Sequence, residues 1–231
     1  MEPTTVLVID DEPQIRRVVK NALQHAGTRV IEAGSALEGV DLAAAEQPTL
    51  IILDLGLPDR DGADVCRDLR AFTSVPIIVL SARHQEREKV ALLDAGADDY
   101  MTKPFSTAEL QARVRARLRR DTSSAAVGNQ AVVQEGELSI DLVKRAVKVA
   151  GALVHLTPTE WDLLRAFATH ANQTLTHHQL FTAVWGSVAG DAQQYLRVYV
   201  GQLRRKIESD PVRPKFIKTE PGVGYRFELS E

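Results

Sequence analysis

Short apolar runs alternate with segments of helical periodicity about five times in the first half of this chain. The runs are rich in Val, Ile and Leu, which is typical of strands buried on both faces of a parallel sheet. Strict alternation of strand and helix predicts an α/β fold with right-handed crossovers. We expect strands at residues 6–10, 29–32, 50–54, 76–81 and 98–101, and helices at 14–25, 36–45, 63–72, 87–95 and 106–120.

Charged side chains follow three of these runs. VLVI ends at Asp10 and Asp11, LIIL ends at Asp54, and DDYM ends at Thr102-Lys103-Pro104. In an open doubly wound sheet the carboxyl ends of the strands form the ligand-binding edge, so these side chains should converge. Carboxylates that lie together repel one another, which raises at least one pKa unless a cation neutralises them. The pattern predicts a divalent metal site with a lysine beside it.

Each of these residues also has a simpler explanation. Asp10 and Asp11 can cap a helix that begins near Pro13, and Asp54 can be a turn residue. Lys103 taken alone would be a solvated surface charge in most proteins. The coincidence of all of them at predicted strand ends favours one shared pocket over the separate explanations.

Length and composition predict two domains in a cytoplasmic protein. A chain of 231 residues is long enough for two ordinary cores, and the small polar segment DTSSAAVGNQA separates two different patterns. We expect a first domain at residues 1–121, a linker at 122–132 and a second domain at 133–231. No apolar run is long enough for a membrane span, and the N-terminus lacks a signal-like segment. The single cysteine, Cys66, excludes an internal disulfide.

The first domain resembles a known family. Asp10-Asp11, Asp54, Ser81 and Lys103-Pro104, in that order and at those strand ends, are similar to the receiver domain of bacterial two-component response regulators. The resemblance is specific because the positions are spread over about a hundred residues and all coincide with the predicted topology. It implies a flavodoxin-like fold with a five-stranded parallel sheet. It also implies that Asp54 accepts a phosphoryl group from a histidine kinase.

The same resemblance implies a Mg²⁺ site. Asp11 and Asp54 would bind the ion directly, Asp10 would act through a water, and Gly56 would contribute its backbone carbonyl. These oxygen ligands suit Mg²⁺, which also keeps several of its waters.

Three further residues would respond to the phosphoryl group. Lys103 would neutralise charge on its oxygens, and Ser81 would move to hydrogen-bond one of them. Tyr100 would then pack into the space that Ser81 leaves, which turns a charge event into a repacked surface.

Charged residues around the last predicted helix of the first domain match those that pair across a symmetric dimer in the OmpR/PhoB branch of response regulators. A two-fold interface requires self-complementary charges of this kind. The alternative is ordinary pairing within one chain. The resemblance implies the pairs Lys89 with Glu109, Asp98 with Arg113 and Asp99 with Arg120.

The second half predicts a winged helix-turn-helix domain. Short alternating segments at 133–140, 145–149 and 153–156 indicate a small antiparallel sheet. Thr157, Pro158 and Glu160 form a capping box at the start of a helix. A second helix is expected at 179–185 and a third at 193–208, followed by two strands around a glycine turn within 216–229.

The third helix has the pattern of a DNA-recognition helix. Leu196, Val200, Leu203 and Ile207 share one face and should pack on the core. Arginines and amides on the other side suit the major groove, and neighbouring cations suit phosphates. The alternative is a solvated basic face. The candidate DNA contacts are Gln194, Arg197, Val198, Gly201, Gln202, Arg204 and Arg205 on the helix, with Lys218 and Arg226 on the wing.

LTPTEWDLL, QLFTAVWG, YLRVYVGQLRRKI and GVGYRF resemble the effector domain of the same OmpR/PhoB family. Within it, stretches such as IILDLGLPD and ELQARVRARLRR resemble regulators of potassium-transport operons. The resemblance implies a regulator, not an enzyme, that dimerises on tandem half-sites of promoter DNA when phosphorylated, with RNA polymerase as a further partner and no membrane contact.

Two other function classes stay open. A phosphohydrolase of the haloacid dehalogenase kind also uses a strand-end Asp as nucleophile, but it usually has a second Asp two residues later, where this chain has Gly56. A DNA architectural protein that does not respond to phosphorylation is the third possibility.

Overall fold

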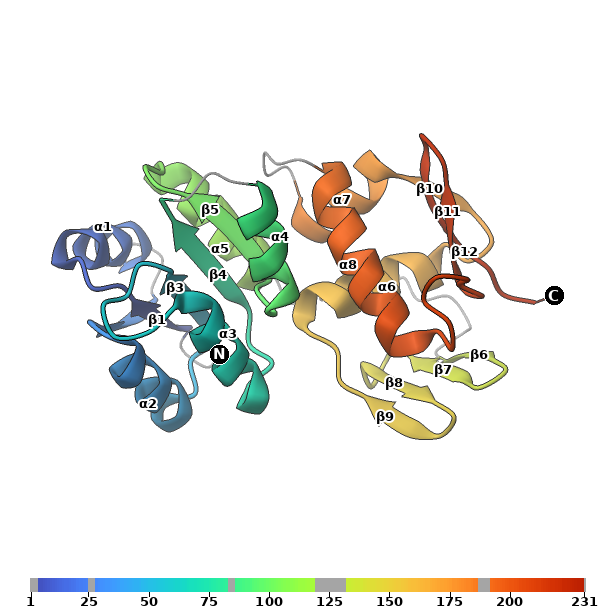
Figure 1. Cartoon of the computed structure of the whole chain (residues 1–231), viewed down its shortest axis with the longest axis horizontal. Coiled ribbons are helices and arrows are strands. Elements are labelled where there is room, and N and C mark those ends of the chain that lie inside the picture. The colour runs from blue at the N-terminus through green and yellow to red at the C-terminus, as the bar shows by residue number, and fades with distance from the viewer. Residues whose placement is uncertain (1–3, 25–27, 83–85, 119–131, 187–191, 231) are drawn as a thin grey trace. The chain divides into compact units, whose positions relative to one another are not determined.

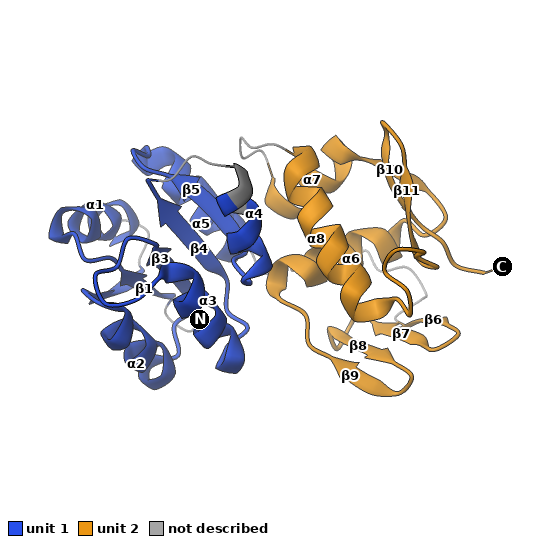
Figure 2. Ribbon diagram, in the orientation of Figure 1, with its two compact units in different colours: residues 1–119 blue, residues 120–231 orange. Residues whose placement is uncertain are grey.

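The computed structural model describes residues 4–24, 28–82, 86–118, 132–186 and 192–230. The chain divides into two compact units, residues 1–119 and 120–231 (Figure 2). Residues 122–131 of the predicted linker lie outside the described residues, and Val132 is already the first residue of a strand.

The first unit alternates strands and helices along its whole length (Figure 1). Its elements are β1 Thr5–Ile9, α1 Pro13–Gln24, β2 Arg29–Ala33, α2 Ala36–Glu46, β3 Leu50–Asp54, α3 Gly62–Phe72, β4 Ile77–Ser81, α4 Glu86–Asp94, β5 Asp99–Thr102 and α5 Thr107–Leu118.

The five strands form one parallel sheet in the order β2-β1-β3-β4-β5. This is the flavodoxin-like order, and it confirms the predicted fold class of the first unit. The apolar runs are continuous rather than alternating because both faces of the sheet are covered. Every residue of β1, β3 and β4 is buried.

Helices cover the two faces of this sheet. Val6 and Val8 of β1 belong to a core cluster that includes Val19 of α1 and Leu110 of α5. Ile9 points the other way, toward α2, where a Cβ built on Gly39 would lie 2.5 Å from Ile9 Cδ1. The strand period of two therefore gives each face its own helices.

The described part of the second unit contains two antiparallel sheets and three α-helices (Figure 1). The four-stranded sheet has the order β6-β7-β8-β9, and the three-stranded sheet has the order β10-β12-β11. The elements are β6 Val132–Glu135, β7 Leu138–Asp141, β8 Ala146–Val149, β9 Ala152–Val154, α6 Pro158–Thr169, β10 Thr174–Thr176, α7 His177–Trp185, α8 Ala192–Ile207, β11 Ile217–Glu220 and β12 Gly224–Phe227.

Two helices of this unit, α6 and α7, begin with a capping box. The Thr157 hydroxyl accepts a hydrogen bond from Glu160 N, and Glu160 Oε2 accepts one from Thr157 N at 2.7 Å, so the predicted capping box is present. Thr176 and Gln179 form a second capping box at the start of α7, which the sequence reading did not identify.

The prediction differs from the structure in two places. The expected strand 133–140 is two strands, β6 and β7, because Gly136 turns the chain with φ +55°, a conformation that favours glycine. Strand β10, which completes the wing sheet, was not predicted. It is only three residues long and pairs with β12 through Leu175 and Tyr225.

Aromatic side chains close the core between α7 and α8. The ring of Trp185 lies 5.0 Å from Phe181, 5.5 Å from Tyr195 and 5.4 Å from Tyr199, measured between centroids. Such rings bury large apolar areas and hold α8 in a defined orientation. No helix in the described part of the chain is long and apolar enough to cross a bilayer.

Candidate functional site

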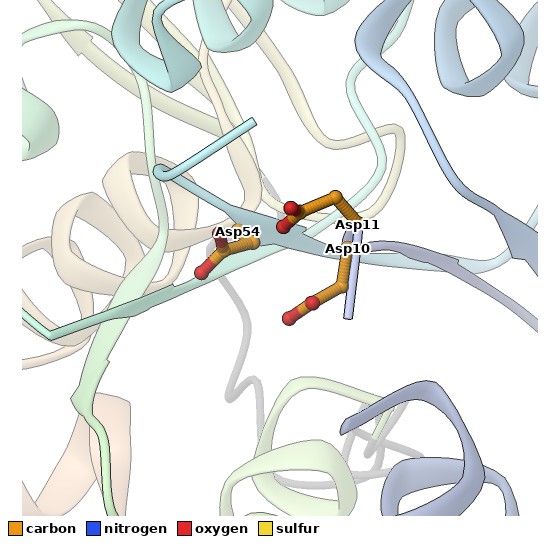
Figure 3. A group of neighbouring side chains, drawn as sticks. All are labelled: Asp10, Asp11 and Asp54. Carbon is orange, nitrogen blue, oxygen red and sulfur yellow. The ribbon is translucent and has the colours of Figure 1, made fainter. Parts of the chain in front are cut away.

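Three carboxylates converge at the carboxyl edge of the parallel sheet. Asp10 follows β1 directly, Asp54 ends β3, and these strands are neighbours in register, with Ile9 opposite Leu53. Carboxylate oxygens of Asp10, Asp11 and Asp54 all lie within 4.8 Å of one another (Figure 3). Asp10 and Asp54 are buried, whereas Asp11 is exposed. The predicted cluster is therefore brought together, and it is open to solvent on the side of Asp11.

Lys103 joins the cluster from the segment after β5. Its Nζ atom lies 2.8 Å from Asp10 Oδ2 and 2.8 Å from Asp54 Oδ1. Burial alone would lower the pKa of Lys103, but its hydrogen bonds to the two carboxylates outweigh burial, and the pKa is raised. The ammonium group stays charged. The Lys103-Pro104 peptide bond is cis.

Burial raises the pKa of Asp10, and the nearby charge of Asp54 acts in the same direction. Hydrogen bonds from Lys103 and from the backbone N–H of Glu12 act against this rise. A cation that entered the cluster would favour the charged form of Asp10. Three carboxylates with one solvent-facing member form a donor set that fits a hard divalent ion such as Mg²⁺.

The loop after β3 is folded back on the cluster. Gly56 N donates a hydrogen bond to Asp54 Oδ2 at 2.8 Å. At the other end of the loop, a Cβ built on Gly62 would lie 2.7 Å from Leu55 Cα and 2.9 Å from Asp54 O. Gly62 is thus required here because α3 starts in contact with the backbone that carries Asp54.

Asp59 ties the same loop to a neighbouring helix. Its carboxylate accepts hydrogen bonds from Ala36 N at 2.9 Å and Leu37 N at 3.1 Å, at the start of α2. These backbone N–H groups lower the pKa of Asp59. This contact was not predicted from the sequence, in which Asp59 lies 23 positions from Ala36 and 22 positions from Leu37.

Two further residues near the cluster were not predicted from the sequence. Glu12 Oε1 lies 3.3 Å from Lys103 Nζ. Arg16 Nη1 donates to the backbone oxygens of Asp10 at 2.6 Å and Asp11 at 3.2 Å, which holds the segment that carries the acidic pair. A third acidic residue directly after Asp10 and Asp11 was a visible signal for Glu12. Arg16 has no comparable signal.

The second candidate surface is the exposed side of α8. Arg197 and Arg205, eight residues apart, are exposed, and Gly201 lies between them with nothing within 4 Å of a built Cβ. Gln194 and Val198 are partly exposed on the same side. The predicted core residues of the helix, including Leu196 and Ile207, are buried.

Comparison with known proteins identifies both units. The response regulator receiver domain matches residues 6–115, and the C-terminal domain of transcriptional regulatory proteins matches residues 151–227. The KDP operon transcriptional regulatory protein KdpE of Escherichia coli (strain K12) is 49% identical over 98% of this chain and 100% of its own length. The chain belongs to the OmpR/PhoB family of response regulators.

Other relatives agree with this assignment. Transcriptional regulatory protein KdpE of Mycobacterium tuberculosis (strain ATCC 25618 / H37Rv) is 48% identical over 97% of this chain and 99% of its own length. The crystal structure of response regulator DrrB, a Thermotoga maritima OmpR/PhoB homolog, is 30% identical over 98% of this chain and 99% of that chain, with a TM-score of 0.51. The chain is therefore a two-domain transcription regulator controlled by phosphorylation, not an enzyme.

The predicted switch residues of this response regulator lie on the strands next to Asp54. Ser81 ends β4, which pairs with β3, and its carbonyl accepts a hydrogen bond from Lys103 N at 2.8 Å. Tyr100 lies on β5 opposite Val79. Both residues are buried in this structure. Their predicted response to phosphorylation stays a prediction.

The charges predicted to join two response regulators pair within one chain here. Asp98 is completely buried and accepts a hydrogen bond from Arg70 of α3. Arg113 Nη1 lies 2.7 Å from Asp99 Oδ1, and Arg113 Nη2 lies 2.9 Å from Glu109 Oε1. The alternative of intramolecular pairing thus holds for these residues. The side chain of Lys89 and all of Arg120 lie outside the described residues, and pairing across a dimer stays a prediction.

Several residues predicted to contact DNA are buried or bonded to other residues of the second unit. Gln202 is buried, because Tyr195 and Tyr199 widen the core face of α8 beyond the predicted stripe. Arg204 donates to Ile217 O at 2.7 Å and to Thr219 Oγ1 at 2.8 Å, which fastens β11 to the helix.

The two wing cations also have protein partners. Arg226 contacts Glu220 and Glu228, while Lys218 Nζ donates to Pro214 O at 2.5 Å. Any contact of these residues with DNA stays a prediction.

Proposed function

We propose that Asp54 is the phosphoacceptor of this response regulator and that Asp10, Asp11 and the Gly56 carbonyl join it in holding Mg²⁺. One observation carries the proposal: Lys103 Nζ is 2.8 Å from both Asp10 and Asp54, while Asp11 completes a cluster within 4.8 Å. A nucleophile, a cation and oxygen ligands for a metal are therefore within reach of one phosphoryl group.

The transfer can be written with its bonds balanced. An oxygen of the Asp54 carboxylate attacks the phosphorus of a phosphohistidine in line, the P–N bond breaks, and the electron pair leaves with the imidazole. Lys103 then faces a phosphoryl oxygen in place of the Asp54 oxygen that it contacts here. Bound Mg²⁺ supplies charge neutralisation for the phosphoryl oxygens.

In the proposed mechanism, phosphorylation of Asp54 alters the rest of the receiver through Ser81 and Tyr100. Ser81 is next to Asp54 in strand order, and its backbone is bonded to Lys103. We propose that Ser81 hydrogen-bonds the new anion and that Tyr100 of β5 repacks in response. This change would favour a homodimer through α4, β5 and α5. Asp99, Arg113 and Glu109 would have to exchange some of their present partners for those of a second chain.

The second domain is proposed to bind double-stranded promoter DNA with α8 in the major groove. Arg197 and Arg205 lie on the exposed side of that helix, which has no side chain at Gly201 to limit approach. A dimer would place two such helices on tandem half-sites and raise the effective concentration at the second one. RNA polymerase is the proposed partner at the promoter, and the cytoplasm is the proposed location.

The regulated operon is proposed from the relatives. Two of them carry the name KdpE, one as the KDP operon regulator, at 49% and 48% identity over nearly the full chain. We propose that this protein likewise controls a potassium-transport operon.

Phosphorylation is tested by incubation with acetyl phosphate and Mg²⁺, followed by intact mass measurement. Wild-type protein should gain one phosphoryl group, and Asp54→Asn should gain none. Asp64→Asn is the matched control, because its carboxylate lies on α3, is 56% exposed and pairs only with Arg67 in the contacts of the described chain. Phosphorylation of Asp54→Asn, or release of phosphate from small esters by the wild type, would contradict the proposal.

The DNA step is tested separately with the promoter of a potassium-transport operon and a scrambled duplex of equal length. Phosphorylated wild type should bind the promoter more tightly than the unphosphorylated protein does. Equal affinity for both duplexes in both states would instead support the architectural role.

A further inference from the structure

The wing hairpin carries four charged side chains on one face. In the β11–β12 register Lys218 is directly opposite Arg226, and Glu220 is opposite Gly224. Because side chains alternate along a strand, Glu220 and Glu228 lie on the same face as these two cations. We name Lys218, Glu220, Arg226 and Glu228 the wing quartet. Two positive and two negative charges give this face no net charge.

The opposite face of the hairpin is the one that packs on the helices. Tyr225 and Phe227 contact the ring of Phe167 from α6, at 6.5 and 6.4 Å between centroids. Thr219 accepts its hydrogen bond from Arg204 of α8. The wing quartet is therefore on the outer, solvated face of the sheet, where all four side chains are between 31% and 39% exposed.

Arg226 is held by both acidic members of the quartet. Its Nη2 atom lies 2.7 Å from Glu228 Oε1 and 3.1 Å from Glu220 Oε1. Lys218 Nζ is 3.9 Å from Glu228 Oε2 and donates to Pro214 O. Exposed ion pairs contribute little to stability. Their effect on an approaching phosphate is larger, since the phosphate must displace two carboxylates and then lies close to both.

The exposed side of α8 differs from this arrangement. Arg197 is exposed, and within the described residues it has no carboxylate partner. Among the described residues, a phosphate that binds Arg197 has no carboxylate to displace. Arg197 on α8 and the wing quartet thus differ, because the quartet's charge is already balanced within the described residues whereas Arg197 has no carboxylate partner among them.

We propose that Glu220 and Glu228 keep the wing cations from binding DNA phosphates, so that salt-dependent affinity comes from α8 and not from the wing quartet. This inference rests on the proposed DNA binding. Under this inference the two glutamates weaken DNA binding. Lys218 and Arg226 then do not make the phosphate contacts that are expected from the sequence.

The test is the salt dependence of binding to a short random-sequence duplex, measured with the full chain. Each phosphate contact adds about 0.9 to the slope of log K against log salt. Arg226→Gln should leave the slope unchanged. Glu220→Gln combined with Glu228→Gln should steepen it by about 0.9 to 1.8, so that a fourfold rise in salt weakens binding roughly 3.5- to 12-fold more than in wild type.

Two further variants complete the design. Arg226→Gln added to the double glutamine variant should remove about 0.9 of the gained slope. Arg197→Gln should make the wild-type slope shallower by a similar amount, which shows that the assay reports contacts made by α8. Circular dichroism and thermal melting of every variant check that the wing still folds.

The outcomes separate the two proposals. A shallower slope for Arg226→Gln in the wild-type background, or an unchanged slope for the double glutamine variant, would overturn the inference while DNA binding stands. If the wild-type chain shows no salt-dependent binding to any duplex, the proposed DNA binding fails and the inference fails with it.

Discussion

Lys103 Nζ lies 2.8 Å from Oδ1 of Asp54, the residue that we propose as the phosphoacceptor. In the unphosphorylated chain this lysine therefore neutralises the Asp54 carboxylate, and under the proposed mechanism it would neutralise the phosphoryl group after transfer. The same ammonium group also contacts Asp10 at 2.8 Å, so its removal changes the charge of the whole cluster.

Lys103→Met should separate metal binding from phosphoryl transfer. The three carboxylates then lack a fixed cation, so Mg²⁺ affinity should stay the same or increase in a calorimetric titration. The rate of phosphorylation by acetyl phosphate should fall by roughly 10²-fold, the usual effect of losing one group that stabilises developing charge. A variant with weakened Mg²⁺ binding and an unchanged rate would contradict these roles.

Asp98→Asn should destabilise the receiver itself. The Asp98 side chain is 0% exposed, pairs with Arg70 and accepts a hydrogen bond from Ile77 N at 2.9 Å. Breaking a buried ion pair costs about 3–5 kcal/mol, which calorimetry of the full chain should detect in the receiver transition. Asp64→Asn, at an exposed pair, should cost less than about 1 kcal/mol. A dimer defect in Asp98→Asn without loss of stability would favour the predicted intermolecular pair instead.

Asp59 should give the receiver an acid-dependent contribution to stability. Its pKa is below the unfolded value of 3.8 because Ala36 N and Leu37 N donate to its carboxylate. The contribution is fully present above the unfolded pKa and is lost as the pH falls through the lower folded pKa. Carboxyl NMR should find the Asp59 midpoint below 3.8. In Asp59→Asn the melting temperature should lose this part of its pH dependence, and an unshifted midpoint would show that the contact with α2 does not form in solution.

Thr157→Ala should destabilise the second unit by about 1 kcal/mol, the usual cost of losing an N-cap. Both tryptophans of the chain, Trp161 and Trp185, lie in that unit, so intrinsic fluorescence during urea unfolding reports on it selectively. Thr182→Ala is the control, because Thr182 is exposed within α7 and alanine is the better helix former. Equal midpoints for the two variants would show that the capping box contributes no measurable stability.

The sheet and the acidic cluster could be predicted from sequence because both depend on local patterns. A buried strand has a continuous apolar run, and a residue directly after it must lie at the edge of the sheet. Asp10 and Asp54 needed only this rule and parallel pairing to be placed together. The capping box at Thr157 was equally local, since its partners are three residues apart.

The missed contacts join residues that no periodic pattern connects. Asp59, in the loop after β3, reaches Ala36 at the start of α2, and Arg226 meets Glu220 only through the register of the wing strands. The helical period placed Leu196 correctly but underestimated the apolar face of α8, because Tyr195 and Tyr199 are buried there and bring Gln202 inside with them. These outcomes depend on tertiary packing, which composition and spacing do not contain.

Gly62 lies so close to the backbone of Leu55 and Asp54 that the position of Asp54 depends on the absence of a side chain at residue 62. Exchange of this residue for alanine would alter no charge and no hydrogen-bonding atom, yet it would push the acceptor strand out of place. We therefore expect substitution at this apparently inert position to disturb the proposed phosphorylation site even though every charged group is retained.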